Sequence, residues 1–366
     1  MTHPFTQELK QLAKDYAALL MLQGSSLPLQ LIWLSLLARW LGPYALGIYL
    51  IALAVGQFAF RGLIGWASDT VVRFGTTELI RSKKLQQTVQ MRSWLILCSV
   101  LFGILLLQVS AHGIQQWATG LSRWGIHGLC ALLIGMGIWD LGLAIARTLG
   151  EIRRYAACSS IRHLLLIGGF LLANAGGSKQ SAERIIALEA AAYTAIGLYL
   201  LIRYRSYMAL PWPPPWKDLA RSIRYAWSNG ITYLAGYAVD WFDLFAIRFF
   251  MGLSAAGSYQ FGYRIMLLPS TALMGILVLL FPLFMRWKAN QESEKISAFF
   301  SAYLPKFSWF WSSMITLLIA VTPELVRMVG GSTYQDATAP LMLLWCGLAF
   351  QILSVMTAPM SPRNAN

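Results

Sequence analysis

Residues 39–49 read RWLGPYALGIY, and residues 249–259 read FFMGLSAAGSY. At an offset of 210 positions the two stretches share four aligned pairs, which are Gly42 and Gly252, Ala45 and Ala255, Gly47 and Gly257, and Tyr49 and Tyr259. Each stretch lies between two long apolar runs, which is the pattern of an internal repeat. In a membrane protein, repeated helical halves point to a transporter whose site lies between the halves.

The composition is that of a membrane protein. The chain has 366 residues, of which 57% are hydrophobic and 12% are charged, and its mean hydropathy is +0.56. A soluble domain carries about twice that charged fraction, and a single soluble core could not bury this much apolar helix. The sequence therefore predicts an all-α polytopic membrane protein.

Apolar segments of spanning length recur along the whole chain, each close to the roughly 20 residues that cross a bilayer. The first is longer than the apolar region of a cleavable signal, so we expect it to be retained. The ten predicted spans are residues 17–39, 46–70, 92–111, 126–147, 159–176, 183–203, 225–249, 258–284, 303–323 and 340–359.

The basic residues set the predicted orientation. The net charge is +14, and of the 29 Lys and Arg residues 21 fall in alternate loops and six in the opposite loops. The larger group includes Arg92, Arg147 and Arg162, which are assigned to loops. The positive-inside rule then predicts that both termini lie in the cytoplasm. Charge placed in this way favours contact with membrane lipids, and no nucleic-acid partner is expected.

The offset also predicts the domain organisation. It carries the third and fourth spans onto the ninth and tenth, whereas the fifth and sixth would fall beyond residue 366. We therefore expect a 6 + 6 design that ends after 6 + 4 helices, with a natural ten-helix protein as the alternative. The predicted parts are an N-terminal six-helix bundle over residues 1–205, a Pro-rich cytoplasmic linker over 206–222 and a C-terminal four-helix bundle over 223–366.

The first repeat stretch also carries a family resemblance. The pattern Arg39-x-Leu41-Gly42-Pro43-x-x-x-Gly47-x-Tyr49 resembles the opening of Wzx-type polysaccharide (O-antigen) flippases, which belong to the multidrug/oligosaccharidyl-lipid/polysaccharide (MOP) exporter superfamily. The resemblance runs from about residue 10 to 358 and lacks the family's helices eleven and twelve. In the second half it rests on Asp243, Gly252, Gly257, Tyr259, Pro282, Gly330 and Tyr334.

The resemblance implies a fold and a function. The family pairs two pseudo-symmetric six-helix bundles across a central cavity and moves polyprenyl-diphosphate-linked oligosaccharide from the cytoplasmic to the outer leaflet. It implies a multi-pass transporter of the bacterial cytoplasmic membrane, not an enzyme, that acts in the biosynthesis of lipopolysaccharide or another polysaccharide. The implied protein partners are a polysaccharide polymerase and glycosyltransferases.

Two arginines lie inside predicted spans. Arg61 shares a helical face with Ser68, and Arg264 shares one with Gln260 in the repeat-equivalent span. After the offset they are seven residues apart, which is nearly two turns, so they occupy corresponding faces. Two guanidinium groups lining one cavity suit a diphosphate headgroup. The alternative is that each pairs with a nearby carboxylate or reaches to the interface.

Two further arginines, Arg39 and Arg248, end the first and seventh spans on the predicted outer side. They are candidates to guide the headgroup toward release. Arginines at such positions more often anchor a helix at the membrane interface, which is the alternative we favour.

Three aspartates inside spans, Asp243, Asp240 and Asp140, are candidates for coupling transport to a proton or sodium gradient. The resemblance places Asp243 at the family's recurrent seventh-helix aspartate. The alternative is a structural salt bridge to Arg264, Arg61 or Arg147.

Other chemistry finds little support in the sequence. It contains no G-x-x-x-x-G-K-[ST] motif for ATP, and its four histidines and four cysteines show no metal-ligand spacing. We expect no catalytic residues, no metal and no cofactor beyond a coupling H⁺ or Na⁺. The alternative functions are a MATE-like multidrug antiporter, a membrane glycosyltransferase or polymerase, and a non-functional truncated remnant.

Overall fold

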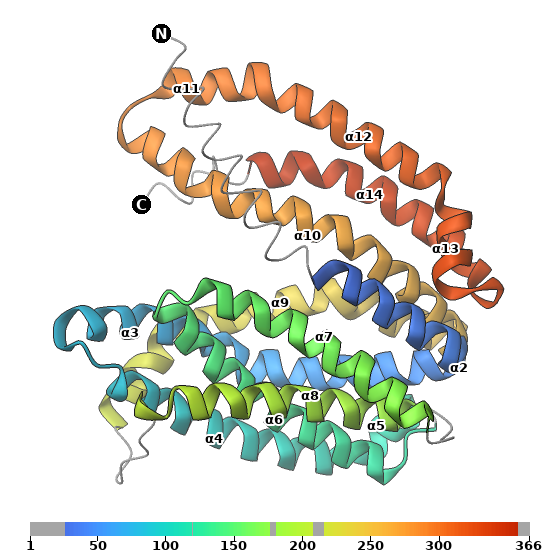
Figure 1. Ribbon diagram of the computed structural model, residues 1–366, viewed down its shortest axis with the longest axis horizontal. Coiled ribbons are helices and arrows are strands. Elements are labelled where there is room, and N and C mark those ends of the chain that lie inside the picture. Colours follow the sequence, from blue (N-terminus) through green and yellow to red (C-terminus); the bar gives the residue numbers. More distant parts are fainter. Residues whose placement is uncertain (1–25, 119, 176–180, 208–215, 358–366) are drawn as a thin grey trace. The chain divides into compact units, whose positions relative to one another are not determined.

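The computed structural model of the protein describes residues 26–118, 120–175, 181–207 and 216–357. Within these ranges all regular structure is helical, and no strand occurs (Figure 1). Each predicted apolar segment falls on helical elements wherever the structure describes it. The predicted fold class, an all-α polytopic membrane protein, is confirmed.

The helices follow one another with short connections. Three 3₁₀ turns, Gly65–Ala67, Arg205–Tyr207 and Ser332–Ala337, and a π-helical turn, Phe299–Tyr303, lie between or beside them. The helices are α2 (Ser26–Leu63), α3 (Ser68–Ser82), α4 (Gln86–Val109), α5 (Ala111–Trp117), α6 (Arg123–Thr148), α7 (Ile152–Ala175), α8 (Ala182–Arg203), α9 (Trp216–Met251), α10 (Leu253–Ala289), α11 (Ser293–Ala298), α12 (Leu304–Ala320), α13 (Thr322–Gly330) and α14 (Thr338–Thr357).

Five helical stretches of the described chain are long and apolar enough to cross a membrane. The first of them is 57 residues long, which is enough for two crossings. A sixth candidate is a pair of helices, Glu294–Ala320 and Thr322–Gly330, bent by 61°. The number of ten crossings stays a prediction. The five stretches are Ser26–Ser82, Gln86–Val109, Arg123–Thr148, Arg153–Ala175 and Ala182–Arg203.

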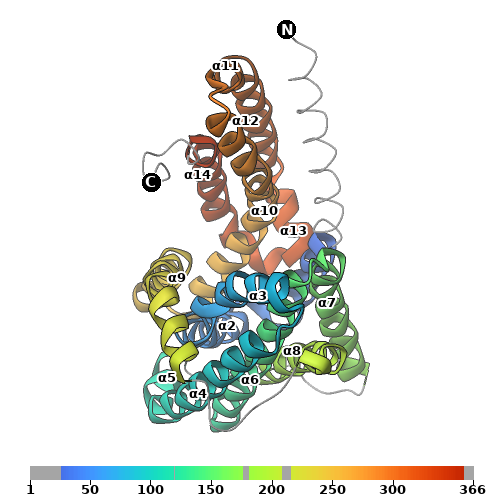
Figure 2. The ribbon, with the colours of Figure 1, turned by 90° about the vertical axis from the view of Figure 1, so that its left-hand side faces the viewer.

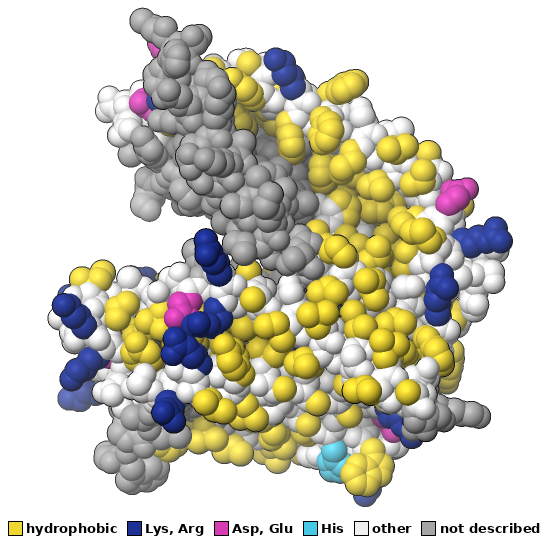
Figure 3. All heavy atoms as spheres, viewed as in Figure 1, with side chains coloured by type: hydrophobic (Ala, Val, Ile, Leu, Met, Phe, Trp, Pro, Cys, Tyr) yellow, Lys and Arg dark blue, Asp and Glu magenta, His cyan; other side chains and the backbone are white. Residues whose placement is uncertain are grey.

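The outer faces of these helices are apolar. On α4, Leu101, Phe102 and Leu105 are exposed, and on α7 so are Leu164 and Leu172. In Figure 3, hydrophobic side chains are the most widespread coloured type among the described residues, and Lys and Arg form a few separate groups. An apolar surface of this extent indicates that lipid, not water, surrounds the helices.

The helices pack as two compact units, which are described separately. One unit is Trp40–Gly257, and the other combines Met1–Arg39 with Ser258–Asn366, as far as these are described. Compared with the two predicted halves, the start of α2 is grouped with the late helices, and α9 is grouped with the early ones. The predicted division into bundles over 1–205 and 223–366 stays a prediction.

Within the unit Trp40–Gly257, α6 lies between α4 and α8 (Figures 1 and 2). Glycines allow α6 and α8 to approach closely. A Cβ atom on Gly135 would lie 3.0 Å from the Ala190 carbonyl oxygen, and one on Gly197 would lie 2.9 Å from the Trp139 backbone nitrogen. Small residues at helix crossings are the usual means of tight packing in membranes, where no hydrophobic effect drives association.

The two repeat stretches bend the chain in the same way. Gly42 has φ +70° and kinks α2 just before Pro43, and the aligned Gly252 has φ +93° between α9 and α10. A residue with a side chain rarely adopts these angles, so glycine is required at both points. Proline after Gly42 also disfavours helical geometry at the residue that precedes it.

The two stretches then pack against each other inside the same unit. A Cβ atom on Gly47 would lie 2.2 Å from the Leu253 carbonyl oxygen, and one on Gly257 would lie 2.0 Å from the Pro43 carbonyl oxygen. The offset of 210 carries position 43 onto 253 and position 47 onto 257. The contact is therefore reciprocal, with each repeat presenting the same two positions to the other, as a local pseudo-twofold axis requires.

A polar cluster holds the junction between α6 and α7. Gly150, with φ +72°, ends α6 in a Schellman motif, in which the Glu151 amide donates to the Ala146 carbonyl oxygen at 2.9 Å. The Glu151 carboxylate accepts hydrogen bonds from the Tyr204 hydroxyl, at 2.5 Å, and from Arg154. The Tyr204 hydrogen bond holds the pKa of Glu151 below its usual range, and burial raises the pKa of Tyr204 to about 12.

Tyr204→Phe is therefore expected to destabilise the protein by about 1–2 kcal/mol at neutral pH, because the carboxylate loses its phenol donor. A depressed pKa in the folded protein contributes stability above the unfolded value of about 4.3, and this contribution is lost as the pH falls through the folded pKa. Unfolding midpoints of wild type and variant should differ by a constant amount near neutrality and converge below about pH 4. The exposed Tyr199→Phe on α8 is the control, and a gap that persists undiminished in acid would contradict the assignment.

Candidate functional site

Two of the predicted site residues meet inside the unit Trp40–Gly257. Arg61, in the last turn of α2, places Nη1 2.7 Å from Oδ2 of Asp240 on α9. The side chains remain 31% and 41% exposed, so the pair is reachable from outside the helices. A charge pair with this much exposed surface is open to a charged ligand that competes for one of its members.

Aromatic residues fix the register of α9 on α2 beside this pair. The Tyr237 hydroxyl donates a hydrogen bond of 3.1 Å to the Ala54 carbonyl oxygen. The Tyr237 ring also packs against Phe58, with centroids 5.2 Å apart, and stacks with Trp241 at 6.3 Å. These contacts hold Asp240, three residues after Tyr237, opposite Arg61.

Asp243 lies one helical turn beyond Asp240 and is half-buried. Its Oδ1 accepts a hydrogen bond of 2.7 Å from the backbone nitrogen of Leu244. The joint role of Asp240 and Asp243 in ion coupling stays a prediction.

Asp140 has a different partner from the one expected. Its carboxylate lies 2.8 Å from Nη2 of Arg92 and accepts a hydrogen bond of 2.8 Å from the Ser68 hydroxyl. The Arg92 side chain is fully buried and also donates to the Ile64 carbonyl oxygen at 2.7 Å. The assignment of Arg92 to a loop was wrong, because it stands inside the first two turns of α4 and points into the unit.

The expected partner of Asp140, Arg147, points elsewhere. Its Nη1 lies 3.7 Å from Oδ1 of Asp69, and both side chains are partly exposed. Ser68, predicted on the same helical face as Arg61, instead donates a hydrogen bond to Asp140. The structure thus separates a buried pair, Arg92 with Asp140, from the accessible pair of Arg61 and Asp240.

Arg264 belongs to the other unit, on α10, where it is half-buried. One turn before it, Gln260 is 1% exposed, and its side-chain amide nitrogen has no hydrogen-bond partner among the described residues. A buried donor without a partner is unusual in a native structure and marks a place where a polar ligand group would be stabilised. That Arg61 and Arg264 line one cavity stays a prediction.

The comparisons with known proteins agree with one another. A family of polysaccharide biosynthesis proteins matches residues 183–339. A probable low-salt glycan biosynthesis flippase of Haloferax volcanii is 21% identical over 322 residues, which cover 86% of this chain and 64% of the relative. The chain thus spans less than two thirds of the length of that curated relative.

Solved structures of transporters share the fold. A MATE transporter in complex with MaD3S matches with TM-score 0.61 and 15% identity, over 98% of this chain and 84% of that chain. An outward-facing multidrug resistance MATE family transporter of the MOP superfamily matches with TM-score 0.57, 15% identity and the same coverage. The predicted likeness to polysaccharide flippases is confirmed, and the solved structures show that the chain has the fold of MATE transporters. At family level the chain is thus similar to flippases and transporters.

Arg39 and Arg248 both bind the ends of short helices. Arg39 Nε donates at 3.3 Å to the Val329 carbonyl oxygen, in the last turn of α13, and Nη2 donates to that of Met328. Arg248 Nε donates at 3.0 Å to the carbonyl oxygen of Trp117, which ends α5. Cations at helix C-termini satisfy free carbonyl groups and the helix dipole. This geometry suits the anchoring alternative, and headgroup guidance stays a prediction.

Sequence reasoning missed a second buried cluster in the unit Trp40–Gly257. Glu189 accepts a hydrogen bond of 3.0 Å from the Tyr49 hydroxyl and lies 3.0 Å from Nη1 of Arg162. Arg162 had been assigned to a loop, which was wrong, because it lies within α7 and also sits over the Tyr193 ring at 4.8 Å. The repeated tyrosine at position 49 was the available signal, since a buried phenol requires a hydrogen-bond partner.

Proposed function

We propose that this chain moves a polyprenyl-diphosphate-linked oligosaccharide from the cytoplasmic to the outer leaflet of a bacterial cytoplasmic membrane by alternating access. The observation that carries the proposal is that Arg61, which lies within a predicted span, is paired yet accessible. The likeness to a glycan biosynthesis flippase and to polysaccharide biosynthesis proteins supports the class of cargo. The chain's N-terminus would lie in the cytoplasm, and the linker over 206–222 would join two rocking bundles.

The proposed recognition step is an exchange of counter-ions. The planar guanidinium of Arg61 can bind two phosphate oxygens at once, and a diphosphate that takes Nη1 displaces Asp240 from it. The freed Asp240 carboxylate would then take up a proton or a sodium ion, because an uncompensated charge at this depth is costly. Binding of the headgroup and uptake of the coupling ion would thereby be one event.

Other charged residues would have supporting parts. Arg264 would supply a second guanidinium group from the other half, and Arg39 and Arg248 would lie on the release path. Asp243 and Asp140 remain further candidates for the coupling ion. Glycosyltransferases would assemble the lipid-linked oligosaccharide before it is flipped, and a polysaccharide polymerase would receive it afterwards. O-antigen precursors are the cargo we propose.

The test combines complementation of a flippase-deficient strain with binding of a fluorescent polyprenyl diphosphate to purified protein. Arg61→Ala and Arg264→Ala are each expected to reduce both to background, and the exposed Arg123→Gln should leave both unchanged. The double variant Arg61→Ala with Asp240→Asn separates two roles of Arg61. If Arg61 only neutralised Asp240, the double variant would recover activity, and such a rescue, or full activity in both single variants, would reject the proposed role. Gain of drug resistance without glycan transport would indicate the antiporter alternative.

A further inference from the structure

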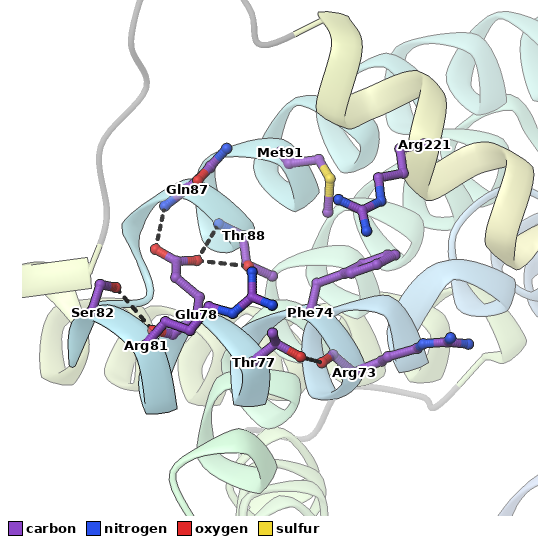
Figure 4. A pocket seen from close by; sticks show the side chains of 10 residues that line it. All are labelled: Arg73, Phe74, Thr77, Glu78, Arg81, Ser82, Gln87, Thr88, Met91 and Arg221. Carbon is purple, nitrogen blue, oxygen red and sulfur yellow. Dashed lines mark hydrogen bonds between the residues drawn. The ribbon is translucent and has the colours of Figure 1, made fainter.

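A cavity of about 440 Å³ lies where α3, the start of α4 and the first turns of α9 meet (Figure 4). All three helices belong to the unit Trp40–Gly257. Neither Arg61 nor Asp240 lines the cavity, and α9 is the only helix that contributes to both sites. Its lining includes three arginines, Arg73, Arg81 and Arg221, and one glutamate, Glu78.

The single carboxylate of the lining is already engaged. Glu78 Oε1 accepts a hydrogen bond of 3.1 Å from the backbone nitrogen of Gln87. Its Oε2 accepts two more from Thr88, at 2.9 Å from the backbone nitrogen and 2.7 Å from the hydroxyl. These bonds cap the start of α4, where free amides and the helix dipole favour a negative charge. Glu78 is thus held against α4, and its one negative charge is outnumbered by the three arginines of the lining.

Two of the arginines face the space. In Figure 4 the guanidinium groups of Arg81 and Arg221 point toward the cavity from α3 and from α9. Arg73 instead extends away from the centre and lies over the Tyr225 ring at 4.0 Å. Among the side chains that the structure describes, no carboxylate forms an ion pair with Arg81 or Arg221. The cavity is thus cationic and presents two forked donors to one occupant.

The inner wall of the cavity is apolar. Phe74 and Met91 line it and continue into a hydrophobic seam formed by Ala67, Met91, Leu95, Leu219 and Ala226, where α9 packs on α3 and α4. Two tryptophans near the start of α9, Trp216 and Trp227, are 65% and 64% exposed. Exposed tryptophans in a membrane protein mark the headgroup level of the bilayer. A cavity with basic residues at its opening and apolar residues on its wall fits an amphipathic anion, such as an anionic lipid, better than a small soluble anion.

We propose that this cavity binds the phosphate of an anionic phospholipid headgroup, with Arg81 and Arg221 as its ligands. The lipid's phosphate accepts hydrogen bonds from both guanidinium groups, and its acyl chains extend along the apolar wall and the exposed face of α9. The bound lipid joins α3 to α9 at the end of the unit that the positive-inside rule assigns to the cytoplasm. This site is independent of the proposed cargo site.

The experiment uses the full purified chain in phosphatidylcholine nanodiscs that contain a photoreactive phosphatidylglycerol, with crosslinked peptides mapped by mass spectrometry. Saturable labelling is expected within residues 73–91 and 216–227. Arg81→Gln and Arg221→Gln should each reduce it about tenfold, because each removes a charged hydrogen bond to phosphate. Arg81→Lys should retain part of the labelling. Arg205→Gln, which removes an exposed charge outside the cavity, should retain all of it.

Each other outcome overturns the proposal. Unchanged labelling in both glutamine variants would show that Arg81 and Arg221 do not bind the lipid. An equal loss of labelling in Arg205→Gln would show that labelling depends on surface charge in general and not on this cavity. Because Arg81 makes no described contact with another side chain, its variant tests binding without disturbing the fold. Complete competition by inorganic pyrophosphate would assign the cavity to a free anion. Displacement by a polyprenyl diphosphate at much lower concentration would assign it to the cargo instead.

Discussion

Gly257→Ala is expected to prevent the chain from accumulating as a folded membrane protein. The new methyl carbon would lie 2.0 Å from the Pro43 carbonyl oxygen and 2.9 Å from the Gly47 backbone nitrogen. Both obstacles are backbone atoms, which cannot rotate away as the end of a side chain can. Overpacking costs about 1–3 kcal/mol and more where the backbone must move, so we expect at least ~3 kcal/mol here. Gly47→Ala meets the Leu253 carbonyl oxygen at 2.2 Å and should be equally harmful.

The measurement is the yield of monodisperse protein in detergent, together with its thermal unfolding midpoint. Gly236→Ala is the matched control, because it adds the same methyl group to α9 where no atom lies within 4 Å. That control should be neutral or stabilising by up to about 1 kcal/mol, since alanine favours helix over glycine. Wild-type yield and midpoint in Gly257→Ala would show that the two repeat stretches do not touch.

The repeat was readable from the sequence, but the contact between its copies was not. Aligned glycines at positions 42, 47, 252 and 257 predict a recurring local geometry, and the structure gives one, with positive φ at Gly42 and Gly252. That Gly47 and Gly257 face each other's repeat depends on how α2 and α10 cross. A crossing is a long-range packing event, and helical periodicity carries no information about it beyond which face is small.

The candidate site could be predicted only in part, again because the sequence does not show which helices pack against each other. Arg61 and Asp240 stood out because charge is rare inside apolar segments, and the sequence named Arg61 among three possible partners for the aspartates. The buried position of Arg92 was not predicted. Because Arg92 comes directly before an apolar run, a hydropathy pattern places it at the end of the span and not inside the protein. Its burial depends on the neighbours that α4 meets, namely Asp140 on α6 and Ser68 on α3. The distribution of apolar residues gives the position of a residue along a span only approximately. It does not show which side chain on another helix that residue contacts.

Breaking the buried pair is expected to destabilise the protein nearly as much as the glycine substitutions. Arg92→Met leaves Asp140 with only the Ser68 hydroxyl, and Asp140→Leu leaves a fully buried guanidinium group without its carboxylate. Removing one partner of a buried ion pair costs about 3–5 kcal/mol. The unfolding midpoint of each single variant should therefore fall on the order of 5–10 °C. Arg147→Met, in the partly exposed pair with Asp69, should cost no more than about 1 kcal/mol.

The double variant Arg92→Met with Asp140→Leu decides what the pair does. It replaces two charges by apolar groups of similar size, so most of the lost stability should return, and the two substitutions should be strongly coupled. Single variants as stable as Arg147→Met would contradict the structural role. The folded double variant also separates stability from transport in complementation. If it transports, Asp140 is a structural residue and ion coupling rests with Asp240 or Asp243. If it folds and fails to transport, transport requires the charge of Asp140 or of Arg92 in addition to their part in stability.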